Sequence, residues 1–235
     1  MAMNIAPLNQ DQHAALKLKP GHSFAQVKTE NIVPVVVQEF TLCAAECPIV
    51  FTKNRETGKF QPVAMLGFKP GENLFARGEK WAGMFMPGIV ATYPFRIVPH
   101  SQKPDQLFVA LDMDSDLLSE SEGEPLFDAE RQETELLAKR RADLTTYYEY
   151  TLVTENFCKL LEDMDLFVLR SLDLNVGDEK MKLENVYLID EEKLRTLSDE
   201  KYLELRKRGF LPLIYAQANS LHQIRRLAEM KLGYR

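Results

Sequence analysis

Long apolar runs are missing from this sequence, and their absence sets the first limit on its class. A helix that crosses a bilayer needs about 18 or more consecutive apolar residues, and no stretch of this chain approaches that length. Residues 1–20 also lack the basic start, apolar centre and small-residue cleavage site of a secretory signal. We therefore expect a soluble, cytoplasmic protein without a transmembrane segment, although export by a route that uses no such signal would leave this pattern unchanged.

Cysteine is also scarce, with three residues in the chain. An odd, small number without a secretory signal predicts reduced thiols and no disulfide framework. Cys43 and Cys47 are four residues apart, so their sulfur atoms would share one face of a helix. A metal site needs further ligands, and no CxxC motif or paired histidines are nearby. We expect buried thiols here and no metal.

Catalytic motifs are absent as well. The phosphate-binding motifs GxxxxGK[ST] and GxGxxG do not occur. Ser220 lies two residues from His222, but this spacing alone supplies neither the third group nor the oxyanion site that serine attack requires. The histidines are scattered along the chain and form no metal-binding pair: His13, His22, His100 and His222. The sequence therefore predicts no catalytic residue and no cofactor, and it leans against an enzyme.

Three alternating aspartates resemble the beginning of a calcium-binding loop. They are Asp112, Asp114 and Asp116. An EF-hand requires glycine at its sixth position and glutamate at its twelfth, where this chain has Leu117 and Gly123. We interpret the segment as a solvated acidic connector.

Charge is unevenly distributed along the chain. The net charge of −6 argues against general binding to nucleic acid or to an anionic membrane. Residues 112–135 contain ten acidic residues and one basic residue, whereas residues 201–235 contain eight basic and two acidic residues. The two blocks are either surfaces that attract partners or pair between copies, or two solvated surfaces that differ in sign.

The first half of the chain has the pattern of a β-rich structure. Residues 54–58 are typical of a hairpin connection, and residues 38–47 favour a short helix that Pro48 would end. Pro62 suggests an edge strand or a bulge, because proline has no N–H to donate to a ladder. Strands are predicted at residues 34–37, 49–52, 60–68, 95–98 and 107–111.

The second half is mainly helical in pattern. Residues 132–164 predict one long helix, or two helices broken near residues 151–156. A hairpin follows, with alternating apolar residues on both sides of a turn at residues 177–180. Short helices are expected at residues 191–197 and 199–208, with Asp190 and Ser198 as their caps and Gly209 as the stop of the second. Pro212 should begin one final helix whose shared face contains Ile214, Ala218, Leu221, Ile224 and Ala228.

These patterns predict an α+β fold in which a β-rich N-terminal half packs with a helical C-terminal half that contains one β-hairpin. We expect one domain over residues 1–235. Its parts would be a β-rich part at residues 30–112, an acidic connector at residues 112–131 and a mainly helical part at residues 132–235.

Several uncommon short motifs occur in this sequence in the same order as in one protein family. CPIVF at residues 47–51 resembles YPIVF, and PVAMLG at 62–67 with GENLF at 71–75 resembles a second conserved stretch. Trp81 and YPF at residues 93–95 follow, and residues 117–128, 157–166 and 187–221 match later blocks. The chain therefore resembles the SapC family. It departs from that pattern at Cys47, where tyrosine is usual, and at residues 208–210, where Asn-Gly-Trp is usual.

The resemblance implies a role associated with a crystalline surface layer. It also implies an association with outer-membrane receptors, flavin-dependent halogenase-like proteins and cupin-like oxygenases, beside whose genes relatives occur. Neither association defines a chemistry, and the family supplies no catalytic residue to carry over.

The segment from Gly67 to Tyr93 is the main candidate for a binding site. A glycine-rich loop can bring its backbone close to a ligand, and the indole of Trp81 could act as a packing platform. The simpler alternative is turn structure between strands, with Trp81 in the core. The candidate binding residues are Glu72, Asn73, Trp81, Tyr93 and Arg96.

Three hypotheses for function remain open. The leading one is a non-catalytic binding or accessory protein of cell-envelope or peptide- and protein-modifying systems, with a peptide or protein as its partner. The second is an enzyme whose site assembles from distant residues, namely Glu72, Asn73, Arg96 and Asp190. The third is a self-assembling, surface-layer-associated subunit, a homo-oligomer held in part by its oppositely charged blocks.

Overall fold

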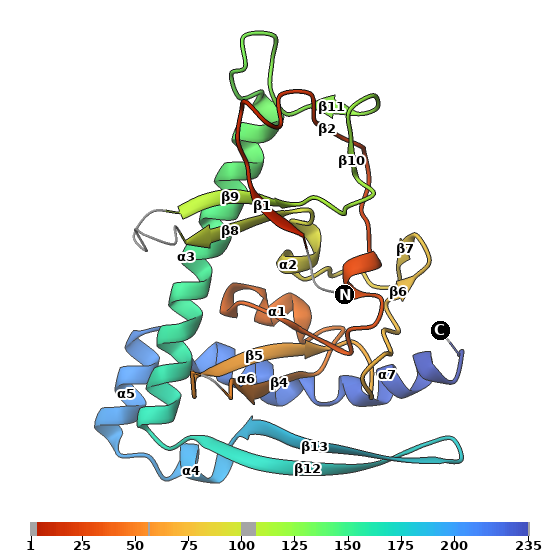
Figure 1. Ribbon diagram of the computed structural model, residues 1–235. Coiled ribbons are helices and arrows are strands. Elements are labelled where there is room, and N and C mark those ends of the chain that lie inside the picture. Colours follow the sequence, from red (N-terminus) through yellow and green to blue (C-terminus); the bar gives the residue numbers. More distant parts are fainter. Residues whose placement is uncertain (1–3, 56, 100–106, 235) are drawn as a thin grey trace. The chain divides into compact units, whose positions relative to one another are not determined.

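The computed structural model describes residues 4–55, 57–99 and 107–234 (Figure 1). Glu56, which belongs to the predicted hairpin connection at residues 54–58, and His100 lie outside the described residues. The chain forms two compact units. The first unit contains residues 1–26 and 88–149, and the second contains residues 27–87 and 150–235. Each unit therefore combines an early and a late segment of the chain.

A three-stranded antiparallel sheet forms the centre of the first unit. Its order is β1 (Ile5–Pro7), β9 (Leu107–Asp112) and β8 (Phe95–Pro99). The two predicted strands here are confirmed, with Phe95 opposite Leu111 in the ladder. The short helix α2 (Gly88–Ala91) precedes β8.

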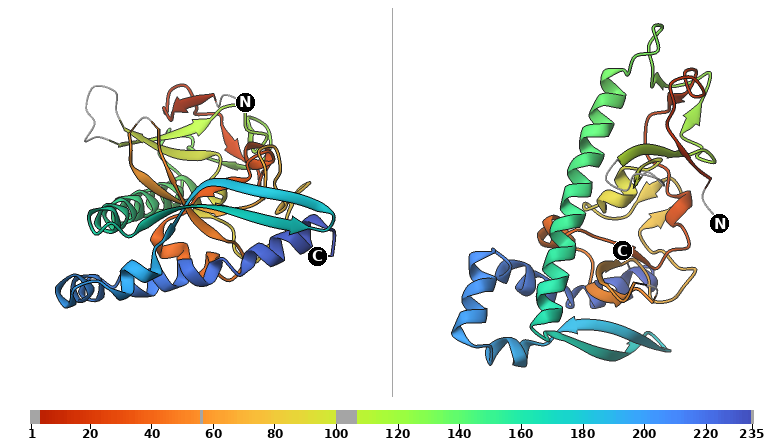
Figure 2. Two further views of the ribbon diagram at one scale, coloured as in Figure 1. Left: turned by 90° about the horizontal axis from the view of Figure 1, so that it is seen from below. Right: turned by 60° about the vertical axis from the view of Figure 1, so that its left-hand side comes forward.

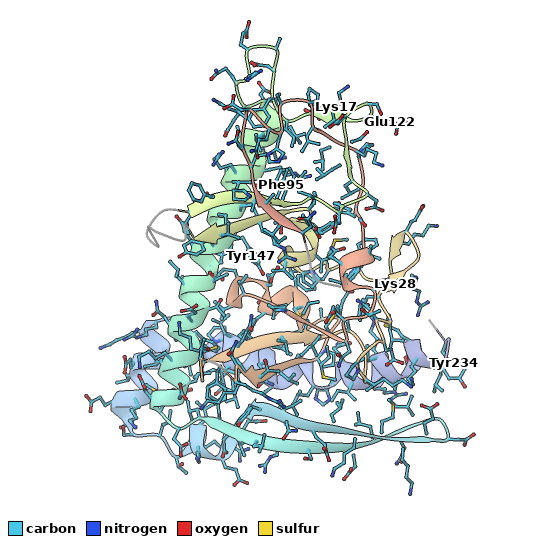
Figure 3. The ribbon with its side chains drawn as sticks, in the orientation of Figure 1. Lys17, Lys28, Phe95, Glu122, Tyr147 and Tyr234 are labelled. Atoms are coloured by element: carbon cyan, nitrogen blue, oxygen red, sulfur yellow. The ribbon has the colours of Figure 1, made fainter. Side chains whose placement is uncertain are left out.

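The acidic connector of the first unit contains two short strands where we predicted only a loop. These strands, β10 (Leu118–Ser119) and β11 (Glu124–Pro125), both pair with β2 (Lys17–Leu18). The ammonium group of Lys17 also donates a hydrogen bond to the carbonyl oxygen of Ser121, and Lys17 and Glu122 are labelled at this small sheet in Figure 3. Pairing with a segment about a hundred residues away could not be read from a connector without periodicity.

The core of the first unit is aliphatic and aromatic. Phe95, labelled in Figure 3, packs in it with Leu111 of β9 and with leucines of the connector. Buried residues of this core are Leu16, Leu18, Tyr93, Phe95, Val109, Leu111, Leu117, Leu126, Phe127, Leu137 and Leu144.

A five-stranded antiparallel sheet forms the centre of the second unit (Figure 1). Its order is β12, β13, β4, β5, β3. The strands span Phe167–Val176 (β12), Glu179–Ile189 (β13), Ile49–Lys53 (β4), Phe60–Met65 (β5) and Ile32–Pro34 (β3). Both hairpins predicted from the sequence, β4–β5 and β12–β13, are therefore confirmed. Figure 2 shows β12 and β13 as a long ribbon, and one residue pair, Tyr187 and Phe51, joins it to β4.

Two details of the β-rich part were wrong. Pro62 lies in an interior strand without a shift in register, since β5 pairs with β4 on one side and with β3 on the other. It is accommodated because the β3 ladder ends at the neighbouring Val63, and the carbonyl oxygen of Pro62 accepts a hydrogen bond from Val35 N. The strand predicted at residues 34–37 ends at Pro34, and Val37 already begins the 3₁₀ helix η2 (Val37–Glu39).

The caps predicted for two short helices are confirmed, whereas the helices predicted at residues 38–47 and 191–197 end earlier than predicted. The helix α1 (Phe40–Cys43) lies in the segment before Pro48. The carboxylate of Asp190 accepts hydrogen bonds from two backbone N–H groups of α4 (Glu191–Arg195), and the hydroxyl of Ser198 accepts one from α5 (Asp199–Lys207). The remaining short elements are η1 (Ala25–Val27) and the hairpin strands β6 (Ala76–Arg77) and β7 (Lys80–Trp81).

The long helix α3 (Glu135–Asp163) is continuous, which decides between one helix and two. It contributes its first part to the first unit and its last part to the second. In the second unit, Phe157 of α3 lies 5.9 Å from the ring centre of Phe40 and 5.1 Å from that of Phe210.

The single final helix was a wrong prediction. The chain forms α6 (Leu211–Ser220) and α7 (Gln223–Lys231) instead. At the end of α6, the Ser220 hydroxyl accepts from Ile49 N at 2.8 Å and the Gln217 amide donates to the Ile49 carbonyl oxygen at 2.9 Å. The buried face of α6 is thus set by polar bonds to β4, which a search for apolar periodicity overlooks.

The architecture confirms the α+β class, with sheets formed mainly by the N-terminal half and helices by the C-terminal half. Within the part of the chain that the structure describes, no helix has both the length and the apolar character that a membrane span requires.

Candidate functional site

The glycine-rich loop, defined here as residues 67–87, belongs entirely to the second unit. It begins with a close approach of two backbone segments. A methyl group added at Gly67 would lie 2.3 Å from the carbonyl oxygen of Glu72, so only glycine fits without a shift. The β6–β7 hairpin then leads to Trp81 and, four residues later, to the buried Phe85.

Glu72 anchors the beginning of the loop to the C-terminal helix. One carboxylate oxygen accepts from Phe68 N at 2.8 Å, and the other lies 2.6 Å from the Nζ atom of Lys231 on α7. Both side chains of the ion pair are 14% exposed. Burial by itself would raise the pKa of Glu72, but the bonds from Lys231 and Phe68 outweigh it, and the pKa is lowered from its ordinary value. Glu72 is therefore ionised at neutral pH and structurally engaged.

Asn73 fixes the middle of the loop through backbone atoms. Its amide nitrogen donates to the carbonyl oxygen of Val27 at 2.7 Å. Its amide oxygen accepts from Phe75 N at 2.9 Å and from Ala76 N at 3.0 Å. An Asn side chain offers few further groups once these bonds are made, so Asn73 shapes the loop before any ligand arrives.

Trp81 packs inside the loop. Its indole nitrogen donates to the carbonyl oxygen of Phe85 at 2.7 Å, and its ring centre lies 5.5 Å from that of Phe75. The side chain is half-buried, whereas Phe75 is fully buried. Trp81 thus contributes to the packing of the loop and stays partly accessible. This outcome is intermediate between the two alternatives from the sequence, an exposed platform for a ligand and a core residue.

Glu46, from the segment after α1, holds the outer end of the loop. Its carboxylate accepts from Met84 N at 2.8 Å, and Arg226 of α7 lies 3.3 Å from the same carboxylate. The Arg226 guanidinium also donates to the carbonyl oxygen of Glu46 at 3.0 Å. A methyl group added at Gly83 would lie 2.4 Å from the Glu46 carboxylate, so the backbone is pressed against this anchor.

Met84 is the exposed large apolar residue of this loop. Its backbone N–H is held by Glu46, yet its side chain is 99% exposed. The next residue, Phe85, is 9% exposed and is contained in the same turn. The arrangement presents one polarizable apolar side chain to solvent from a backbone whose conformation is already set.

One family model covers almost the whole of this chain. The SapC family model matches residues 8–227. The chain belongs to the SapC family. Neither the search of curated proteins nor that of solved structures finds a match.

In this SapC-family chain the two remaining candidate residues, Tyr93 and Arg96, belong to the first unit. The hydroxyl of Tyr93 lies 3.2 Å from the carboxylate of the buried Asp112, which also accepts from Asn4 N at 3.3 Å. Burial is the main cause that raises the pKa of Tyr93. The Nε atom of Arg96 is buried without a hydrogen-bond partner among the described residues.

The SapC-family chain therefore brings Glu72, Asn73 and Trp81 together in one loop and places Tyr93 and Arg96 in another unit. Four residues of the loop and its anchors were missed from the sequence: Glu46, Met84, Arg226 and Lys231. Three of them are charged residues whose partners lie more than a hundred positions away or across a loop, and no local pattern identifies them. Met84 could have been noticed as a methionine between a glycine and a phenylalanine.

The polar residues that an assembled catalytic site would need have separate structural roles. Glu72 pairs with Lys231, Asn73 bonds to backbone, and Asp190 caps α4. Among the described residues, no three His, Cys, Asp or Glu side chains lie where they could hold one metal ion.

All three cysteines are free and buried, as the sequence predicted. A hydrogen bond with Cys47, and then burial, raises the pKa of Cys43. Burial raises the pKa of Cys158 to about 12. Low thiolate content makes such cysteines poor nucleophiles and poor metal ligands at neutral pH.

Proposed function

We propose that this SapC-family protein is a non-catalytic binding or accessory protein, and that its partner is a peptide or a protein. The contact would be made by the Met84 side of the glycine-rich loop. The observation that carries the proposal is a 99% exposed methionine on a backbone fixed by Glu46. Methionine is adaptable and polarizable, and binding surfaces use it to accommodate apolar side chains of varied shape.

The fixed backbone supports the same proposal on energetic grounds. Binding is weakened when a loop must become ordered. Here Glu46, Glu72 and Asn73 already hold the loop through bonds of 2.6–2.8 Å, so its conformation is set in the free protein. The proposal includes a location in the cytoplasm and an association with cell-envelope or peptide-modifying systems. It rests here on the family resemblance together with three free cysteines.

Trp81 supplies the test, because the chain has a single tryptophan and it lies three residues from Met84. Pools of random linear peptides are titrated against the full chain while the indole emission is recorded. We expect some pools to change the emission with saturation, and Met84→Ser to weaken their binding about tenfold, as loss of a central apolar contact does.

The matched control is Leu42→Ser, since Leu42 is also a large exposed apolar residue of the second unit, at 65% exposure. It should leave the titration unchanged. Equal binding by the wild type and Met84→Ser, with both folded, would remove this loop from the proposal.

A further inference from the structure

The strands β4 and β13 separate soon after they meet. Among the described residues, one pair joins them, with Tyr187 of β13 opposite Phe51 of β4. The strand β4 continues to Lys53 in its ladder with β5 on the other side. The ladder between β4 and β13 therefore ends while both strands continue, and the backbone groups beyond this end are not joined across the two strands.

A β-bulge lies at the same point on β13. The β12–β13 ladder shifts register so that two residues of β13, Glu184 and Asn185, are opposite one residue of β12, Ser171. Asn185 has a φ of 60°, in the left-handed region that asparagine adopts more readily than most residues. Bulges are common next to active sites, where they redirect a side chain. This bulge adds Asn185 to β13 where that strand leaves β4.

A pocket with a volume of about 490 Å³ lies at this place. Small-molecule sites usually have volumes of about 300–1,000 Å³. The pocket is lined by the end of β4, by the turn that follows it and by β13, through Thr52, Lys53, Asn54, Arg55, Gly58, Asn185 and Tyr187. These described lining residues include two cations and no carboxylate. A pocket of one charge sign raises the local concentration of the opposite sign, so this one favours an anion.

Several polar side chains of the pocket have donors to spare. Among the described residues, no hydrogen bond uses the side chains of Thr52, Arg55, Asn185 or Tyr187. The two hydroxyls and the amide can each donate to an oxygen atom. The guanidinium of Arg55 is a planar fork of N–H groups that fits two oxygens of a phosphate or a carboxylate. The lining therefore has the chemistry of an oxyanion site.

The second cation, Lys53, has a partner that a ligand can replace. Its Nζ atom lies 3.1 Å from the carboxylate of Glu162 and 4.5 Å from the ring centre of Phe60. The side chains of the ion pair are 40% and 44% exposed, and pairs this exposed contribute little to stability. The carboxylate in the bulge, Glu184, pairs with Lys182 at 2.7 Å. Neither carboxylate lines the pocket.

We propose that this pocket, at the point where β4 and β13 separate, binds the oxyanion of a small organic molecule, a phosphate or a carboxylate group. Arg55 and Lys53 supply the positive charge, and Asn185 and Tyr187 supply neutral donors. The ring of Tyr187, half-buried and 4.9 Å from the ring centre of Phe60, flanks the organic part of the ligand. The site is separate from the glycine-rich loop, so either proposal can fail alone.

A chemical-shift titration of the full chain by NMR both locates and measures this binding. The probes are phenyl phosphate, benzoate and inorganic phosphate, all at constant ionic strength. We expect phenyl phosphate, benzoate or both to produce saturable shifts of the backbone amides of residues 52–55 and 184–187. The tighter of these two probes identifies the oxyanion as phosphate or carboxylate. Inorganic phosphate should bind more weakly than phenyl phosphate, because it has no ring to pack on Tyr187.

Three variants test the parts of the site. Arg55→Gln should weaken binding about tenfold, since it removes hydrogen bonds between a cation and an anion. Asn185→Gly accepts the positive φ without strain and removes only the amide, so it should weaken binding several-fold. Glu162→Gln should strengthen binding about threefold, because it releases Lys53. The matched control is Arg206→Gln, at an exposed arginine of α5, which should bind as the wild type does.

Three results would overturn the proposal. Shifts that do not saturate and that spread over exposed lysines and arginines would show only general association of anions with the surface. Equal affinity of Arg55→Gln and Arg206→Gln would show that the pocket does not hold the charge of the ligand. Weaker binding by Glu162→Gln would show that the ligand uses this carboxylate and is not held as an anion. Met84→Ser should leave the titration unchanged, which keeps this test independent of the loop.

Discussion

The glycine-rich loop and the β12 edge differ in how their polar groups are satisfied. In the loop, the side chains of Glu72 and Asn73 and the backbone N–H of Met84 all have partners within the second unit. On the outer side of β12, no strand of the described residues provides partners for the backbone. The anchoring polar groups of the loop are thus satisfied within the second unit, and Met84 is its exposed large apolar side chain, whereas the outer backbone groups of β12 have no strand partner among the described residues.

The difference bears on how the loop can bind. A loop whose polar groups are already satisfied needs little ordering when a partner arrives, and its affinity depends on the exposed side chain. An open strand edge offers its backbone groups to any further strand. Variants within the loop should therefore differ in what they change: loop anchors should affect stability, and exposed residues should affect binding alone.

The largest effect on stability should come from the buried ion pair. Lys231→Met leaves the Glu72 carboxylate, 14% exposed, without its cation. We expect a loss of about 3 kcal/mol in the free energy of unfolding, measured by urea denaturation. The matched control is Lys159→Met, whose partner Asp163 lies at 3.3 Å but with both side chains more than half exposed. It should lower the free energy of unfolding by about 0.5 kcal/mol or less. Similar losses of stability in both variants would contradict the role of the Glu72–Lys231 ion pair as an anchor of the loop.

The next effect should come from the close approach at Gly67. In Gly67→Ala the new methyl group meets the backbone oxygen of Glu72 at 2.3 Å, and backbone cannot swing aside as a side chain can. We expect about 2 kcal/mol of destabilisation from this overpacking. Gly71→Ala is the comparison, since space there is open and only the positive φ of 86° opposes alanine, at about 1 kcal/mol. A larger loss of stability in Gly71→Ala than in Gly67→Ala would mean that Gly67 does not approach the backbone of Glu72 closely.

Acid should weaken the loop through Glu72. Its pKa is lower in the folded chain than its ordinary value, so its contribution to stability is complete above the unfolded-state pKa, about 4.3, and is lost as the pH falls through the folded-state pKa. We expect the difference in unfolding free energy between the wild type and Glu72→Gln to shrink as the pH is lowered from 6 to 3, about the range of carboxyl titration. A difference that is independent of pH would show that the charge of Glu72 contributes nothing.

The smallest effect on stability should be at Met84. Because its side chain is 99% exposed, Met84→Ser should change the unfolding free energy by about 0.5 kcal/mol or less. The same substitution is the one expected to reduce peptide binding. A destabilisation as large as that of Gly67→Ala would mean that Met84 packs within the protein, and its value as a contact residue would disappear.

Local structure could be predicted well from this sequence, because its determinants are local. Turn residues 54–58, the caps Asp190 and Ser198, and the alternation of the β12–β13 hairpin each act over a few positions. The strands of the acidic connector and the end of α6 could not be predicted in this way, because they depend on partners far along the chain. Ser220 and Ile49, which meet at 2.8 Å, are separated by 171 positions.

The candidate site shows the same limit. Glycine spacing and the single tryptophan directed attention to one loop, in which Glu72, Asn73 and Trp81 lie together. Sequence could not reveal that Glu72 and Asn73 are used internally, since their partners, Lys231 and Val27, come from remote segments. Met84, the exposed large apolar residue of the loop, belongs to no sequence motif that would have identified it.

Cross-linking from position 84 tests the central proposal most directly. The native thiols are buried, so a thiol introduced by Met84→Cys can be labelled selectively with a photoreactive group. Leu42→Cys, at a residue that is 65% exposed, provides the matched position. With a mixture of random linear peptides, we predict saturable cross-linking from position 84 that unlabelled peptides compete away, and only weak, non-saturable cross-linking from position 42. Equal, non-saturable yields from the two positions would contradict a binding role for the loop.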